Sequence, residues 1–126
     1  MSNIQTAHPT ECILWKTRNL SIDQVRGSFE CVKTFEEESH LTRRMLRCKE
    51  CGHVYFYEFY EEVDWSEGKD AQYITWIPVD DVESAQELSK LSSYEILSFP
   101  SIRYDYPKGA DQATGPYWNC PRNIVE

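Results

Sequence analysis

The feature that most constrains this chain is a pair of cysteines, Cys48 and Cys51, separated by two residues. They lie in the segment CKECG, between two runs of strand-forming residues at 41–47 and 53–63. Gly52 follows the second cysteine and can adopt the positive φ that a tight turn needs. Such a turn directs two thiolates toward one point, which supplies half of a tetrahedral metal site.

A strand, a CxxCG turn and a second strand resemble the knuckle of zinc ribbon proteins, over about residues 47–61. The resemblance implies structural Zn²⁺ with Cys48 and Cys51 as ligands. A zinc ribbon carries a second CxxC pair, whereas this chain has single cysteines at 12 and 120. Cys12 follows an irregular segment and Cys120 lies in one, which suits ligands that must turn toward a shared ion. We therefore expect Cys12, Cys48, Cys51 and Cys120 to bind Zn²⁺.

Two other residues near this motif compete for a place in the site. Cys31 shares a strand face with Phe29 and Phe35, so its pattern indicates a small buried core residue. His53 follows the knuckle directly, and imidazole is also a zinc ligand. Whether Cys31 or His53 replaces one of the four expected cysteines stays open at this point.

The same cysteines allow two chemical alternatives. Redox CxxC pairs usually lie at a helix N-terminus, where the helix dipole lowers the nucleophile's pKa, but here a strand-like run follows Cys51. A zinc enzyme needs an open coordination position, and four available cysteines favour a closed shell. The chain has no GxSxG elbow, no HExxH motif and no glycine-rich phosphate loop. We therefore expect a protein that is not an enzyme.

The hydrophobic pattern favours the α+β class. At 126 residues, the length predicts one domain, 1–126, with a polar N-terminal arm at 1–11. One helix is expected at about 80–91, with Asp80 or Asp81 as its N-cap. Together the patterns predict a mostly antiparallel sheet of four to six strands with that helix packed on one face. Strand patterns occur at 28–36, 42–47, 53–63, 71–79, 94–99 and 102–106.

Charge and cysteine content suggest a compartment. The formal net charge is −8, and five cysteines are an odd number, which in a reducing compartment indicates metal binding rather than a disulfide framework. The sequence shows no secretion signal and no apolar run long enough for a membrane span. We expect a cytoplasmic protein with no membrane partner.

An acidic, aromatic run at 55–65 is the candidate partner surface. Tyrosine and tryptophan are good interface anchors, and flanking carboxylates would steer a basic partner. These considerations favour a small zinc-stabilised protein that binds a basic protein. An inhibitor or immunity protein that neutralises a toxin is one concrete form. The predicted contact residues are Glu58, Tyr60, Glu61, Glu62 and Trp65.

A basic cluster supplies the alternative partner. Arg43, Arg44, Arg47 and Lys49 precede or enter the knuckle, as in zinc ribbons that bind nucleic acid in transcription. The strongly negative net charge opposes this interpretation. Local ion pairs with the glutamate run 36–38 are the preferred role, so nucleic acid is not the expected partner. A zinc enzyme remains the second alternative, and the oligomeric state is open.

Overall fold

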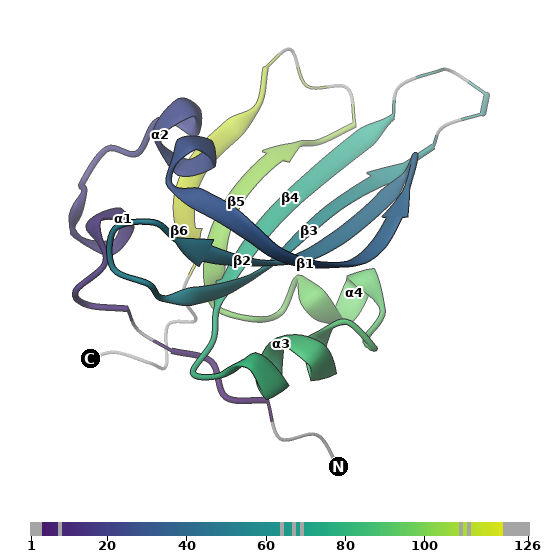
Figure 1. Cartoon of the computed structure of the whole chain (residues 1–126). Helices are drawn as coiled ribbons and strands as arrows, with labels where there is room; N and C mark the ends of the chain where they lie inside the picture. Colours follow the sequence, from purple (N-terminus) through teal and green to yellow (C-terminus); the bar gives the residue numbers. More distant parts are fainter. Residues whose placement is uncertain are drawn as a thin grey trace.

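The computed structural model describes residues 4–7, 9–63, 65–66, 68, 70–108, 110 and 112–119. Helices and strands follow one another as shown in Figure 1. The strands are β1 (Phe29–Glu38), β2 (Leu41–Cys48), β3 (Val54–Glu62), β4 (Ala71–Pro78), β5 (Ser101–Tyr106) and β6 (Thr114–Asn119). The helices are α1 (Ile13–Lys16), α2 (Ile22–Gly27), α3 (Val82–Leu88) and α4 (Ser93–Ile96).

The six strands form one open antiparallel sheet in the order β1-β2-β3-β4-β5-β6. Each strand therefore pairs with its neighbours in the sequence, as expected when short connections join antiparallel strands. The predicted antiparallel sheet is confirmed. The prediction of a single helix is wrong, because four short helices are present in the described part of the chain.

Strand β3 lies inside the sheet and is buried on both faces, as its aromatic pattern predicts. Tyr55 and Phe56 are consecutive and both are fully buried, and successive strand residues point to opposite faces. Tyr55 packs in a core with Leu14 of α1 and Val25 of α2. Phe56 packs in a second core, with α3 and α4. Figure 1 shows these two helices below the sheet and α2 above it.

Two of the helix boundaries follow the capping signals in the sequence. The Ser21 side chain accepts a hydrogen bond from the Gln24 backbone N–H and begins α2. The Asp81 side chain does the same for Ser84 at the start of α3. Both caps satisfy N–H groups that have no partner within the helix, and the second confirms Asp81, one of the two predicted N-caps.

Two segments near the C-terminus differ from their predicted structure. The expected strand at 94–99 is the short helix α4, because Ser92 and Glu95 form a capping box. That Ser-x-x-Glu spacing is a helix-start signal, and it prevails over the Tyr-Glu-Ile-Leu run. The segment 114–119, for which no strand was predicted, is strand β6 and pairs with β5.

Cys31 is exposed, which corrects the prediction that it is a buried core residue. β1 is an edge strand, and its register with β2 shifts between Cys31 and Lys33 and again between Thr34 and Glu36. Each irregularity disrupts the simple two-residue alternation. The face that Phe29 begins is therefore not continued as buried core along the strand.

Part of the N-terminal arm runs beside the end of β4. Thr6 forms an isolated antiparallel bridge with Val79, and the Ala7 backbone N–H donates to the Pro78 carbonyl at 3.0 Å. The Gln5 backbone N–H donates to the Ser84 hydroxyl at 2.8 Å. These bonds place the arm next to α3.

None of the helices in the described part of the chain combines the length and the apolar character that crossing a bilayer requires.

A buried ion pair lies between the sheet and the helices α3 and α4. Arg43 donates from Nε to Glu58 Oε2 at 2.9 Å, and its Nη2 lies 2.8 Å from the same oxygen. The Ser93 hydroxyl donates to this oxygen from α4 at 3.0 Å, and Arg43 also reaches the Ser89 carbonyl. Because Glu58 is fully buried, losing its cation would leave an uncompensated charge in the interior.

We expect Arg43→Met to lower the free energy of unfolding by about 3–5 kcal/mol, the usual result of breaking one side of a buried pair. The double variant Arg43→Met/Glu58→Met removes both charges and should recover much of this loss. Urea denaturation followed by circular dichroism measures both. The matched control is Arg47→Met, since Arg47 is also on β2 but forms an exposed pair with Glu30. It should change stability by less than about 1 kcal/mol; equal losses for the two arginines would contradict the assigned role of the buried pair.

Candidate metal centre

The knuckle holds two of the thiols at the end of β2. The Cys48 backbone N–H donates to the His53 carbonyl at 2.9 Å, and the Gly52 N–H donates to the Cys48 carbonyl at 2.8 Å. Gly52 has φ of 81°, a conformation that other residues rarely adopt. The turn therefore reverses the chain between β2 and β3 and brings the buried Cys48 and the exposed Cys51 close together, as predicted.

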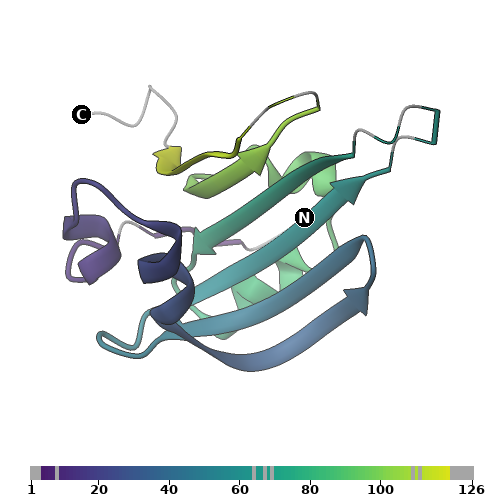
Figure 2. The ribbon, with the colours of Figure 1, turned by 90° about the horizontal axis from the view of Figure 1, so that it is seen from above.

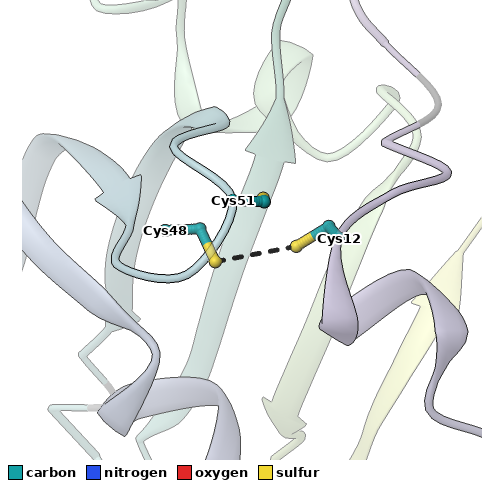
Figure 3. Close-up of side chains that lie close together, drawn as sticks. All are labelled: Cys12, Cys48 and Cys51. Atoms are coloured by element: carbon teal, nitrogen blue, oxygen red, sulfur yellow. Dashed lines mark hydrogen bonds between the residues drawn. The ribbon is translucent and has the colours of Figure 1, made fainter.

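The third thiol comes from a segment remote in the sequence. Cys12 directly precedes α1 and is buried, with 1 % of its surface exposed. Its backbone N–H donates to the Pro9 carbonyl at 2.8 Å, and its carbonyl accepts from Trp15 and Lys16. These bonds fix the turn that leads into α1. Figure 3 shows the sulfur atom of Cys12 pointing toward the sulfur atom of Cys48 in the knuckle.

The ligand atoms of Cys12, Cys48 and Cys51 all lie within 4.8 Å of one another. The Sγ atoms of Cys12 and Cys48 are 3.8 Å apart and are not joined by a disulfide. In a tetrahedral site with Zn–S bonds of about 2.3 Å, two sulfur atoms are separated by about 3.8 Å. This thiol cluster is therefore positioned to bind a metal ion.

Two neighbouring rings enclose the thiol cluster. The Tyr55 hydroxyl donates to Cys12 Sγ at 3.3 Å, a bond that would orient a thiolate ligand in the manner of an outer coordination shell. Burial and this contact with Cys12 raise the pKa of Tyr55, so the phenol remains a donor. His53 packs against the Tyr55 ring with centroids 5.6 Å apart. Nothing in the sequence marked Tyr55 as a partner of a thiol.

The three thiols lie in unequal electrostatic surroundings. Burial acts to raise the pKa of Cys48, but the backbone N–H groups of Cys51 and Glu50 outweigh it and the pKa is lowered. Burial raises the pKa of Cys51 to about 11, and the thiols of Cys12 and Cys48 add to this effect. Crowding several thiolates is costly without a cation. A bound metal ion would offset that repulsion and act on all three sulfur atoms at once.

His53 lies beside the cluster without belonging to it. A small pocket of about 220 Å³ is lined by Cys12, Cys51 and His53 together with residues 9–11. Burial lowers the pKa of His53, which keeps the imidazole neutral, the form that binds metals. Its Nε2 is buried and has no hydrogen-bond partner in the described part of the chain. Cys120, the fourth expected ligand, lies outside the described residues.

The predicted partner-binding residues do not share one face. Glu58 is fully buried in the ion pair with Arg43. Tyr60 is partly buried and stacks on Tyr73 with centroids 6.2 Å apart. Glu61 accepts hydrogen bonds from His40 and from Gln72. Glu58 is therefore not on the surface.

The remaining two predicted contacts are exposed. Glu62 is exposed at the end of β3, and 90 % of the Trp65 surface is accessible in the connection to β4. Tyr94 is 87 % exposed and lies on α4, where the sequence pattern predicted a strand.

The basic cluster is divided between the faces of β2. Arg43 is buried beneath the helices and pairs with Glu58 rather than with the glutamate run 36–38. Arg44 does pair with that run, its Nη2 lying 3.6 Å from Glu37 Oε1. The two consecutive residues point to opposite faces, so the cluster is not one continuous basic surface.

We expect Cys48→Ser to weaken metal binding by more than about 100-fold, because losing a ligand costs at least as much as losing an outer-shell partner. Competition with a chromophoric chelator measures the affinity, and mass spectrometry of the native protein gives the stoichiometry. Cys31→Ser is the matched control, since Cys31 is exposed and outside the cluster. An unchanged affinity in Cys48→Ser would remove Cys48 from the site.

Comparison with protein-family models, with curated proteins and with solved structures finds no match for this chain. No family match therefore supports the zinc ribbon resemblance. The thiol cluster by itself is compatible with a metal site.

Proposed function

We propose that this chain is a zinc-stabilised protein that binds a basic protein partner and is not itself an enzyme. The ion would join the segment around Cys12 to the turn between β2 and β3. Three thiols favour a soft or borderline metal, and Zn²⁺ is the commonest ion in such sites. Joining distant segments is a structural role, and it would hold a chain end that is otherwise prone to fray.

Cys120 is our candidate for the fourth ligand. It directly follows β6, which ends at Asn119. The Trp118 indole N–H donates to the Leu14 carbonyl at 2.9 Å, and Trp118 contacts the Trp15 ring edge-on with centroids 4.8 Å apart. The end of β6 therefore lies beside α1, which begins directly after Cys12. His53 is the competing candidate, because its buried Nε2 has no partner among the described residues.

We expect X-ray absorption of the zinc-loaded protein to give four Zn–S bonds of about 2.3 Å. In Cys120→Ser, the shell should become three sulfur atoms and one lighter atom, while His53→Ala should leave four sulfur atoms in place. If the unmodified protein already shows three sulfur atoms and one nitrogen, and His53→Ala removes that nitrogen, His53 replaces Cys120 in this assignment.

Two aromatic side chains support a binding role. Trp65 is 90 % exposed and Tyr94 is 87 % exposed. Tryptophan and tyrosine are enriched at protein interfaces, where they act as anchors. The pair Tyr60–Tyr73 lies at the end of β3 and the start of β4, the two strands that the segment with Trp65 connects. We take Tyr60, Tyr73, Trp65 and Tyr94 as the aromatic contact region.

The negative charge of the chain favours a basic partner. The chain carries a net charge of −8, and Glu62 is exposed beside the aromatic contact region. A negative surface accelerates association with a basic protein and opposes nucleic acid. An inhibitor or toxin-neutralising immunity protein remains one concrete form of this function.

A photo-crosslinking amino acid at position 65 or 94 should capture a basic protein in the native host. The matched control is position 32, because Val32 is also an exposed apolar residue, 43 % accessible, but lies on the edge strand β1. The double variant Trp65→Ala/Tyr94→Ala should weaken the captured complex by about 30-fold or more, which corresponds to losing a binding hot spot. Equal capture from position 32, or an unchanged affinity in the double variant, would contradict this choice of surface.

A further inference from the structure

The sheet face opposite α3 and α4 holds a pocket that the proposed function does not use. Figure 2 looks onto this face and shows α1 and α2 over one end of it, beside an uncovered stretch of β1 to β4. A pocket of about 280 Å³ opens next to α2. This volume is close to the lower limit for small-molecule sites in proteins.

Aromatic side chains line much of this pocket. Phe29, Tyr57 and Trp76 come from three different strands and all contribute to its surface, with Leu46 beside them. The Tyr57 and Trp76 rings are 5.7 Å apart between centroids and are tilted by 50°. Rings in this arrangement offer π faces and edges to a planar group. Only 1 % of the Trp76 surface is accessible, so Trp76 supports the lining from beneath the surface and the partly buried Tyr57 supplies more of the accessible ring area.

Two guanidinium groups also line the pocket, Arg26 from α2 and Arg44 from β2. Arg26 lies over the Tyr104 ring, with Cζ 5.8 Å from the centroid, so its side chain extends over the sheet. Burial raises the pKa of Tyr57, and the charges of Arg44 and Arg26 oppose that effect. In the sheet order, Arg44 on β2 and Arg26 over Tyr104 of β5 flank β3 and β4, so positive charge lies on both sides of the aromatic lining.

The ion pair of Arg44 leaves room for a ligand. Its partner Glu37 is 68 % exposed and lies 3.6 Å away, and an exposed pair of this kind contributes little. A better-placed anion could displace the Glu37 carboxylate or share the guanidinium with it. Arginine binds carboxylate and phosphate through paired N–H donors, and both anions match this site.

We propose that this pocket binds a small molecule that combines a planar ring with one anionic group. The ring would lie against Tyr57, next to the buried Trp76, and the anion would lie between Arg26 and Arg44. A nucleoside monophosphate and an aromatic carboxylate share this chemistry. Long polyanions are excluded, because the net charge of −8 repels the extended phosphate backbone of a nucleic acid.

The test is titration of the full-length, metal-loaded protein with three probes: adenosine 5′-monophosphate, indole-3-acetate and inorganic phosphate. Amide chemical shifts in two-dimensional NMR locate the binding. We expect saturable shifts at residues 26, 44, 57 and 76 with at least one of the two ring-bearing probes. A response to the nucleotide alone identifies a phosphate ligand, and a response to indole-3-acetate alone identifies a carboxylate. No saturable shift up to about 5 mM, or equal binding of inorganic phosphate, would overturn the proposal.

Substitution of the arginines provides the matched comparison. Arg44→Gln and Arg26→Gln should each weaken binding about tenfold, the effect of losing one charge-assisted contact. Arg47→Gln is the control, because Arg47 is also on β2 and also pairs with a β1 glutamate, Glu30 at 3.2 Å, but does not line the pocket. It should leave the affinity unchanged. Equal effects at positions 44 and 47 would indicate general charge attraction and would overturn the assigned site.

Discussion

The alternation of β3 determines how the rest of the molecule is arranged. Tyr55 and Phe56 point to opposite faces and both are fully buried, so the sheet needs cover on two sides. A six-stranded meander cannot supply that cover itself, and the short helices provide it. Leu14 and Val25 bring α1 and α2 to the Tyr55 face, while α3 and α4 pack over Phe56. The thiol cluster lies where the start of α1 meets the sheet.

That position explains why a metal ion would suit this fold. Helix α1 is only four residues long, and an isolated helix of this length is unstable in water. Its attachment depends on buried Leu14 and on the hydrogen bond from Trp118. Cys12 adds a third attachment directly before the helix, because its Sγ lies 3.8 Å from that of Cys48. A metal bound there would turn a weak contact between remote segments into a coordinated one.

Local signals in the sequence were sufficient for much of this architecture. Asp81 was one of two candidate helix caps, and CxxCG identified the turn between β2 and β3. Those features depend on neighbours within a few residues. The position of Glu58 could not be found in this way, because it depends on Arg43 across the sheet and on Ser93 from a helix that was expected to be a strand. The same holds for Tyr55, whose hydroxyl reaches a cysteine 43 residues away.

The two faces of the sheet differ in their distribution of charge as well as in their packing. On the helix-covered face, Arg43 is neutralised by Glu58 and both are buried, so this arginine is unavailable to a ligand. On the opposite face, Arg44 pairs with the exposed carboxylate of Glu37 and Arg26 lies over a ring. The net charge of the chain is −8. Two neighbouring cations over aromatic groups therefore create a local positive potential on a molecule whose overall charge is negative. Because nearby low-dielectric walls strengthen such local fields, a small anion can be attracted to this pocket while the molecule as a whole attracts cations.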